Sequence, residues 1–260
     1  MKPPAIKTHE IDSSTPVLIV DKIGVIGEAL AIALSHDYLV ILLSPNAPSP
    51  GNEKIIHVPF KKNIPEAPDN RYSKIFIVDD GRSVTKQSAF SFITKARESS
   101  SPLFFIGSVR NVDIEHADEI TASYANSKVL VFGDLFDKNI FFDKNEAINR
   151  YILQARKNGK IEVDGSGLAH SYPISFEDTI KLIIKASYLE IPQKIILLFY
   201  PHPITDISLA NIFQKINPNI VVDFTKDRKK RETYIPFGAQ HAILEYKLED
   251  KIRKLDLEDA

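Results

Sequence analysis

Two residues suited to acid–base chemistry stand four positions apart in the stretch SYANSK, namely Tyr124 and Lys128. On a helix this spacing brings two side chains to one face, where they can act together on one proton. Ser108 ends the apolar run before them and is the third candidate residue of this site. A second interpretation stays open, because the apolar run VLVFG starts directly after Lys128. In that case Tyr124 ends a helix, Lys128 begins a strand, and the two side chains do not share a face.

The stretch PVLIVDKIGVIGEALAIAL has the pattern of a buried strand, a glycine-containing turn and an apolar helix. Many dinucleotide-binding domains begin this way, with the pyrophosphate at the N-terminus of the helix. Gly24 and Gly27 stand at the second and third glycine positions of such a turn, and Asp21 stands at the first. A carboxylate there would repel the pyrophosphate, more strongly where the dielectric is low. The alternative is that the two glycines only permit a tight turn and close packing of the helix on the sheet.

Other residues at the ends of predicted strands bear on the same site. The second strand ends in Ser44, where dinucleotide-binding domains have an acid that binds the adenosine ribose. The fourth strand ends in Asp79 and Asp80, which we expect near Asp21. Carboxylates at sheet ends hold magnesium in some α/β proteins. The simpler interpretation is a solvated turn at Asp80 and Gly81, so we expect no metal.

The composition of the 260 residues excludes several classes of function. The absence of cysteine excludes disulfides, thiolate metal sites and cysteine nucleophiles. The net charge of −1 gives no global attraction to nucleic acid or to an anionic membrane. No apolar run reaches the roughly 18–20 residues of a membrane span. We therefore expect a cytoplasmic protein that binds neither nucleic acid nor membranes.

Short apolar runs alternate with amphipathic stretches up to about residue 145. Strands are predicted at 17–20, 38–44, 54–60, 73–80, 102–108 and 128–136, and helices at 25–35, after Gly81 and at 113–126. Strands that are apolar on both faces and alternate with helices predict a parallel sheet covered on both sides.

The pattern changes after residue 145. Helices are predicted at 144–159, 175–190, about 205–216 and 239–255, and strands at 194–200 and 219–224. Gly159 is a predicted helix C-terminus and Ser175 a predicted N-cap. The fold class is therefore α/β: a Rossmann-like doubly wound parallel sheet (16–145) with a smaller C-terminal α+β lobe (146–260). The lobe is expected to be partly interleaved with the core, and 1–15 to form a flexible arm.

Four segments in the right order resemble the extended short-chain dehydrogenase/reductase family, of the NAD-dependent epimerase/dehydratase type that acts on nucleotide sugars. They are VLIVDKIGVIG, FFIGSVRNVD, KVLVFGDLFDK and GKIEVDGSGLAHSYPISFEDTIKLIIKA. These segments are similar to that family's glycine-rich turn, catalytic-serine strand, tyrosine-glycine-proline strand and lobe segment. The last match is the most specific, and together they extend over roughly residues 16 to 260.

The resemblance implies NAD or NADP as cofactor. Its binding residues would be Gly24, Gly27, Asp21, Ile26, Ser44 and Asp79. It also implies oxidation of a nucleotide-sugar hydroxyl by hydride transfer, with Tyr124 as acid/base, Lys128 lowering the tyrosine's pKa and Ser108 orienting the hydroxyl.

The basic stretch KDRKKRET contains Arg228 and Arg231, which the resemblance implies as ligands of the substrate's diphosphate. The alternative for this stretch is a solvated loop. The alternative for the whole chain is a non-catalytic binding or interaction protein that keeps the fold. A nucleotide sugar is the implied partner, and a homodimer is left open.

Overall fold

The computed structural model describes a large part of the chain. The described residues are 15–22, 24–46, 48, 52–60, 64–79, 86–110, 119, 122–139, 142, 145–190, 192–226, 240–241 and 247–255. The chain divides into two compact units. One consists of Met1–Val78 with Thr85–Leu103, and the other of Asp79–Val84 with Phe104–Ala260.

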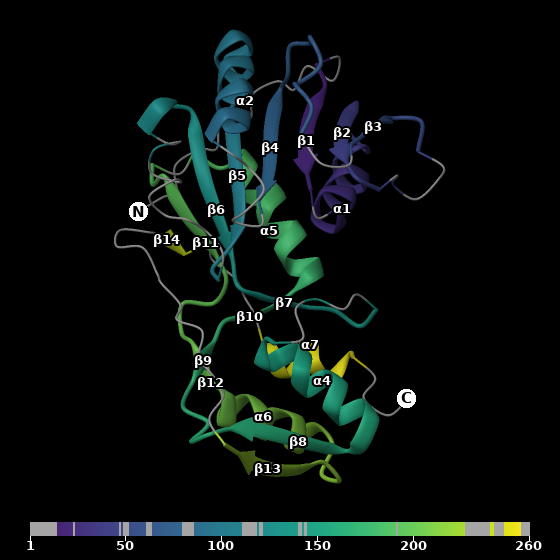
Figure 1. The fold of residues 1–260 in the computed structure, drawn as a ribbon, viewed down its shortest axis with the longest axis vertical. Helices are drawn as coiled ribbons and strands as arrows, with labels where there is room; N and C mark the ends of the chain where they lie inside the picture. The colour runs from purple at the N-terminus through teal and green to yellow at the C-terminus, as the bar shows by residue number, and fades with distance from the viewer. Residues whose placement is uncertain are drawn as a thin grey trace, which may run out of the picture. The chain divides into compact units, whose positions relative to one another are not determined.

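Among the described residues, eight strands form one sheet in the order β14-β11-β6-β5-β4-β1-β2-β3 (Figure 1). They are β1 (Val17–Asp21), β2 (Val40–Ser44), β3 (Ile55–Pro59), β4 (Lys74–Asp79), β5 (Leu103–Ser108), β6 (Ser127–Phe132), β11 (Ile195–Leu198) and β14 (Gln240–His241). The pairs β1–β2, β1–β4, β2–β3, β11–β6 and β11–β14 are all parallel. The prediction of a parallel Rossmann-like sheet is therefore confirmed.

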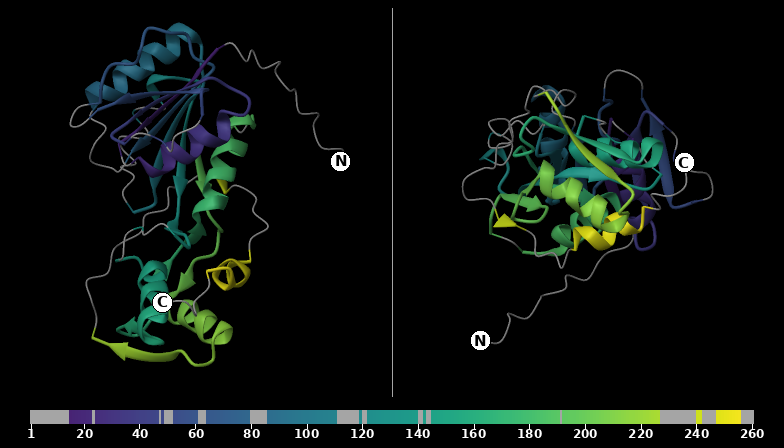
Figure 2. Two further views of the ribbon diagram at one scale, coloured as in Figure 1. Left: turned by 90° about the vertical axis from the view of Figure 1, so that its right-hand side faces the viewer. Right: turned by 90° about the horizontal axis from the view of Figure 1, so that it is seen from below.

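In the first unit, α1 (Val25–Leu34) and α2 (Lys86–Ser99) lie on opposite faces of the strands (Figure 2). Every residue of β1 and β2 is buried, which is why both strands are apolar up to their last residues, Asp21 and Ser44. In α1, Ile26, Leu30 and Leu34 are four residues apart and form its buried face. The strand–turn–helix from β1 to α1 thus has the arrangement that its sequence predicts.

In the second unit, α5 (Phe176–Tyr188) packs on β11. Its N-cap is Ser175, whose hydroxyl accepts a hydrogen bond from the backbone N–H of Asp178 at 3.2 Å. This is the cap that the sequence predicts, and it satisfies one of the unpaired N–H groups of the first helical turn.

The predicted strand 128–136 is interrupted at Gly133. The chain forms β6, then β7 (Asp134–Phe136), and β7 pairs in parallel with β10 (Pro173–Ser175). A Cβ atom at Gly133 would overlap the carbonyl oxygen of Tyr172. The two backbone segments therefore touch at Gly133, and only glycine permits this approach.

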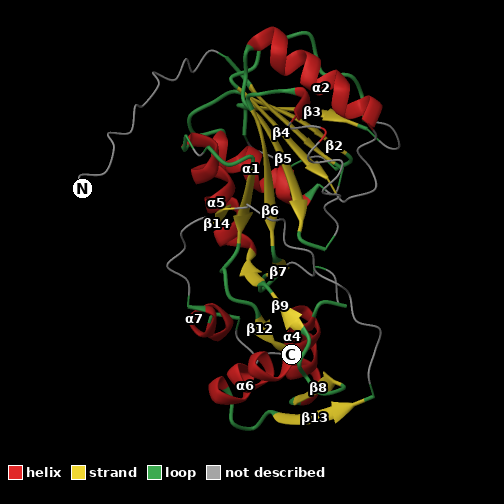
Figure 3. Ribbon diagram, turned by 90° about the vertical axis from the view of Figure 1, so that its left-hand side faces the viewer, coloured by secondary structure: helices red, strands yellow, loops and turns green. Residues whose placement is uncertain are grey.

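The lobe has a hydrophobic core of its own. Its helices and strands are labelled in Figure 3. Its elements are α4 (Ala147–Asn158), β8 (Lys160–Asp164), β9 (His170–Ser171), β12 (Ile204–Thr205), α6 (Asp206–Ile216), β13 (Val221–Thr225) and α7 (Leu248–Arg253). The strands β8 and β13 pair in parallel, and β9 and β12 pair in antiparallel fashion. Gly159 ends α4 with a φ of 58°, as predicted from its position.

The predicted closing helix 239–255 is shorter than expected. Gln240 and His241 form β14, and α7 begins only at Leu248. Pairing of β14 with β11 extends the sheet by one strand. No helix in the described part of the chain is long and apolar enough to span a membrane.

Candidate functional site

The glycine-containing turn lies between β1 and α1, within the first unit. Asp21 is the last residue of β1 and its side chain is completely buried. Its Oδ2 atom accepts a hydrogen bond of 2.5 Å from the backbone N–H of Gly27. Gly27 is the third residue of α1, so the Asp21 carboxylate satisfies one of the N–H groups that a helix leaves unpaired at its start.

The turn requires glycine at positions 24 and 27 for two different structural reasons. Gly24 is the N-cap of α1 with a φ of 92°, a left-handed conformation that favours glycine. Gly27 has ordinary helical geometry, but a Cβ atom there would lie 2.9 Å from Asp21 Oδ2 and closer still to Asp21 Cβ. The side chain of Ile26 is buried in the core, so it does not reach a ligand.

The end of β2 is also held by contacts within the first unit. The hydroxyl of Ser44 donates to the backbone carbonyl of Asn46 at 2.7 Å. The Nε2 atom of His57, on β3, lies 3.2 Å from Ser44 Oγ and 3.1 Å from the Ser44 carbonyl oxygen. The Ser44 side chain is buried. Its hydrogen-bond donor is therefore committed to the protein.

Asp79 ends β4, next to the residue that pairs with Asp21 in the ladder. Its side chain and all of Asp80 lie outside the described residues, so the alternative magnesium site is not placed. In the part of the chain that the structure describes, no three His, Cys, Asp or Glu side chains are arranged to hold a metal ion.

These residues fit a pyrophosphate poorly. A carboxylate already occupies the space over Gly27 and already accepts a hydrogen bond from its N–H group. At an effective dielectric of about 20, two like unit charges about 4 Å apart repel each other by about 4 kcal/mol. A phosphate group would therefore have to displace Asp21 from the N-terminus of α1.

The three residues expected to do the chemistry lie in the second unit, at opposite ends of two neighbouring strands. Ser108 ends β5, and the N–H of Val109 donates to the carbonyl of Phe132 at the end of β6, at 2.8 Å. Lys128 is the second residue of β6, four residues before Phe132. With a rise of about 3.3 Å per residue, about 13 Å of strand separates the two ends. The structure thus does not bring Ser108 and Lys128 together.

The ammonium group of Lys128 lies at the C-terminus of α5. Its Nζ donates to the carbonyl of Leu189, the C-cap residue of that helix, at 3.3 Å. A cation at this position is stabilised by the partial negative charge of the helix end. Burial, and then the nearby ammonium of Lys194, lower the pKa of Lys128. A local structural contact thus accounts for this lysine.

Tyr124 lies in the segment before β6 and is half-buried. Its carbonyl accepts a hydrogen bond from the Ser127 hydroxyl at 2.6 Å. Because Tyr124 is outside a helix and Lys128 is in a strand, the four-residue spacing does not put them on one helix face. Ser108 accepts a hydrogen bond from the N–H of Arg110 at 3.2 Å. The two candidate substrate ligands, Arg228 and Arg231, lie outside the described residues.

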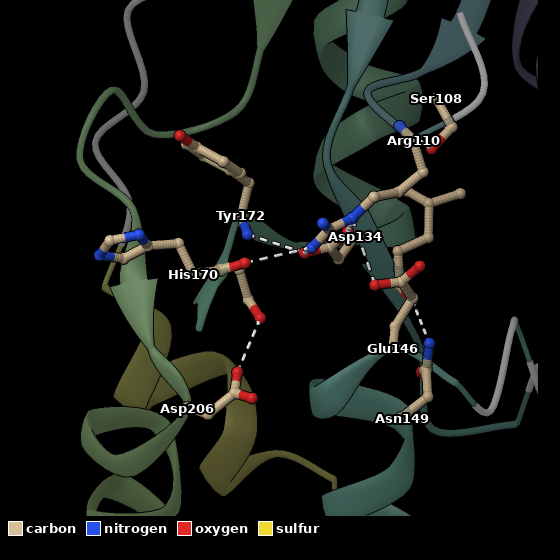
Figure 4. Close-up of polar contacts among 10 residues, drawn as sticks. Ser108, Arg110, Asp134, Glu146, Asn149, His170, Tyr172 and Asp206 are labelled. Atoms are coloured by element: carbon tan, nitrogen blue, oxygen red, sulfur yellow. Dashed lines mark hydrogen bonds and ion pairs between the residues drawn. The ribbon is translucent and has the colours of Figure 1, made fainter. Parts of the chain in front are cut away.

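A buried ionic network in the second unit was not anticipated from the sequence (Figure 4). We call it the Arg110 network; its members are Arg110, Asp134, Glu146 and Tyr172. Arg110 donates through Nε and Nη2 to the two carboxylate oxygens of Asp134, at 2.9 and 3.0 Å. Glu146 lies 3.3 Å from Arg110 Nε, and the N–H of Tyr172 donates to Asp134 at 2.8 Å.

The Arg110 network joins the end of β5 to β7, to the segment before β10 and to the start of α4. Burial by itself lowers the pKa of Arg110, but the carboxylates of Asp134 and Glu146 outweigh it and raise that pKa. The signal in the sequence is Asp134, an acid inside the apolar run VLVFGDLF, because a buried charge needs a partner. A bidentate arginine–carboxylate pair of this kind is rigid, so the network holds these elements in place.

Asp206, the first residue of α6, lies near the same network (Figure 4). Its side chain is buried and accepts a hydrogen bond from the hydroxyl of Ser171 at 3.2 Å. Burial raises the pKa of Asp206, and the guanidinium groups of Arg150 and Arg110 only partly oppose this.

Comparison with protein families and with curated proteins finds no match to this sequence. Solved structures, in contrast, match over almost the whole chain. TunA, an NAD-dependent NDP-hexosamine 5,6-dehydratase, has a TM-score of 0.68 at 12% identity, covering 94% of this chain and 97% of its own. The dTDP-glucose 4,6-dehydratase of Bacillus anthracis, in complex with NAD, has a TM-score of 0.66 at 8% identity, covering 94% and 96%.

A third match is the UDP-N-acetylglucosamine 4-epimerase of Methanobrevibacter ruminantium, in complex with UDP-N-acetylmuramic acid. Its TM-score is 0.64 at 13% identity, covering 94% of this chain and 97% of its own. The resemblance seen in the sequence is thereby confirmed at the level of the fold. The fold of this chain is that of the NAD-dependent nucleotide-sugar epimerases and dehydratases.

Proposed function

We propose that this chain is a nucleotide-sugar epimerase/dehydratase-like protein that binds nucleotide sugars without oxidising them. In this proposal NAD or NADP binds only weakly while Asp21 is in place. Ser108, Tyr124 and Lys128 do not form a catalytic centre.

The position of Lys128 carries this proposal. A lysine that lowers the pKa of a catalytic tyrosine must lie beside it, with a serine within reach of the same hydroxyl. Here the Lys128 ammonium is hydrogen-bonded to Leu189 at the end of α5, and Ser108 lies at the other end of the paired strands. Proton transfer by this set would need a rearrangement of β6, whose residues from Val129 to Phe132 are buried.

Retention of nucleotide-sugar binding is supported by the fold. One solved structure of this fold holds UDP-N-acetylmuramic acid, and the match to it covers 94% of this chain. The basic stretch with Arg228 and Arg231 is the proposed contact for the diphosphate, because guanidinium groups bind phosphate in a bidentate manner.

Titration calorimetry with UDP-glucose, with UDP and glucose as separate controls, tests the binding. We expect UDP-glucose and UDP to bind and glucose alone not to bind. The double variant Arg228→Ala/Arg231→Ala should weaken binding of both nucleotides, while Lys181→Ala, at an exposed lysine of α5 outside the basic stretch, should leave it unchanged. Absence of binding by the unaltered protein would contradict the proposal.

The second candidate function is an NAD(P)-dependent nucleotide-sugar epimerase or dehydratase that uses Tyr124, Lys128 and Ser108. The observation in its favour is Gly24, which keeps the left-handed conformation of a phosphate-binding turn. The two functions differ in turnover. Turnover of UDP-glucose with NAD would give a reduced nicotinamide or an altered sugar. If this turnover occurs and is lost in a folded Tyr124→Phe variant, the chain is an enzyme and the first proposal is wrong.

The proposal also includes the oligomeric state of the chain. A homodimer is the assembly that we would test for, by sedimentation velocity over a range of protein concentrations. A monomer at all concentrations would remove that part of the proposal without affecting ligand binding.

A further inference from the structure

Asp21 does more than add a negative charge near the turn. Its carboxylate is fully buried, and Oδ2 accepts the 2.5 Å hydrogen bond from the third N–H of α1. The N–H groups at the start of a helix form an anion-binding position in many proteins. In this chain the anion at that position is part of the protein.

Gly27 provides the space for this contact. The atoms that a Cβ at Gly27 would meet are the Cβ, Oδ2 and carboxylate carbon of Asp21, and no others are nearer. The lack of a side chain at Gly27 therefore leaves room for Asp21. A ligand phosphate would need the same space.

Ser44, at the position expected to bind the adenosine ribose, is likewise hydrogen-bonded within the protein. Ser44 ends β2 and donates its hydroxyl proton to Asn46, and His57 Nε2 lies against both oxygens of Ser44. The side chains of Asp21 and Ser44, two of the residues expected to contact a dinucleotide, thus both bind other atoms of the protein.

We propose that the Asp21 carboxylate is an intramolecular substitute for a ligand phosphate, and that it determines which ligands this turn accepts. Ligands with a phosphate or pyrophosphate at the start of α1 compete with Asp21 and bind weakly. Removal of the carboxylate turns the same N–H groups and the space over Gly27 into an anion site. This inference concerns the first unit and does not depend on the proposed binding of nucleotide sugars.

Rescue by an added anion tests the proposal. Thermal unfolding of the unaltered protein, Asp21→Gly and Asp21→Asn is followed with inorganic pyrophosphate and with sodium chloride at equal ionic strength. We expect Asp21→Gly to unfold several degrees lower in chloride and to recover a large part of that loss in pyrophosphate. The unaltered protein should gain far less in pyrophosphate, because it shares only the diphosphate contact proposed at Arg228 and Arg231, which both variants also keep.

Asp21→Asn separates charge from space. The asparagine keeps an oxygen acceptor for the Gly27 N–H and fills the same volume without a charge. We expect it to respond to pyrophosphate far less than Asp21→Gly. An equal response of the two variants would show that charge alone excludes phosphate, and would overturn the proposal that the side chain occupies the phosphate position.

The remaining outcomes also decide the question. A pyrophosphate response of the unaltered protein as large as that of Asp21→Gly would overturn the proposal. If Asp21→Gly is unfolded in chloride, folding in pyrophosphate supports the proposal, and failure to fold in both salts overturns it. None of these measurements uses a nucleotide sugar, so their failure is distinguishable from a failure of the proposed function.

A second variant provides a matched geometric control. Gly27→Ala places a Cβ against Asp21 and should lower the Tm of the unaltered protein. In the Asp21→Gly background the same change should lower the Tm clearly less, because the obstructing side chain is gone. Equal losses in the two backgrounds would contradict the close packing of Asp21 on Gly27.

Discussion

Each unit of this molecule buries a carboxylate completely, and the two carboxylates are stabilised in different ways. Asp21 meets a backbone N–H at the start of a helix, where the fold offers a position for an anion. Asp134 meets the guanidinium of Arg110 and the N–H of Tyr172. The first contact uses groups that a ligand could also use, whereas the second uses a charged partner supplied by the protein.

The contact of Asp21 can be replaced by another hydrogen-bond acceptor, whereas the contact of Asp134 with Arg110 is architectural, meaning that the folded protein requires it. A helix N–H left by Asp21 can be satisfied by water or by another anion. Arg110 without Asp134, or the acids without Arg110, would leave a buried charge unpaired. Loss of a charged partner in the interior is therefore much more costly than loss of a helix cap.

The largest effect is expected for Arg110→Met. This change leaves Asp134 and Glu146 buried without their cation and should lower the free energy of unfolding by about 3–5 kcal/mol. Urea unfolding followed by circular dichroism measures it. The free energy of unfolding of Arg110→Lys should lie between those of the unaltered protein and Arg110→Met, because lysine keeps the charge but not the bidentate contact. Lys181→Met, which removes the exposed ion pair with Glu177, is the control and should change little.

A smaller loss is expected for Asp21→Ala. The change removes a side-chain acceptor at the start of α1, and such losses amount to about 0.5–2 kcal/mol. The same unfolding measurement gives the value. If Asp21→Ala proves as destabilising as Arg110→Met, the contrast between a replaceable and an architectural carboxylate is wrong.

Lys128→Met should have a still smaller effect on stability. It removes a cation from the C-terminus of α5, an interaction that contributes about 0.3–1 kcal/mol. Because the Lys128 contact is structural in this proposal, calorimetry should find an unchanged affinity for UDP-glucose. A loss of binding or of turnover without a change in stability would instead favour a catalytic lysine.

For Asp206→Asn we expect a gain in stability that depends on pH. Burial raises the folded-state pKa of Asp206, so its protonated form is favoured in the folded protein. Protonated Asp206 therefore carries no burial penalty below the unfolded pKa, near 3.8. As the pH rises through the folded pKa, the buried carboxylate becomes charged and the protein loses stability. Asparagine stays neutral at every pH and still accepts from Ser171. Its advantage should be present at neutral pH and disappear toward pH 4, as measured by thermal unfolding across that range.

Much of the fold follows from local patterns in the sequence. The strands β1, β2, β5 and β6 are built on runs of consecutive apolar residues, and the cap of α5 and the end of α4 are marked by Ser175 and Gly159. Local patterns predict these features because each depends on residues within one turn or one strand. The break at Gly133 was missed, because its cause is the carbonyl of Tyr172, 39 positions later in the chain. The domain boundary near residue 145 stays a prediction.

The candidate site was only partly accessible to the same reasoning. The sequence by itself determined which residue types stand at the turn, including an acid where the first glycine is expected, and that Tyr124 and Lys128 are four positions apart. Only the tertiary structure decided that the acid binds Gly27 and that Lys128 binds the end of α5. The physical reason is that hydrogen-bond partners of buried polar groups are chosen by which backbone ends meet in space, and spacing along the chain does not specify this.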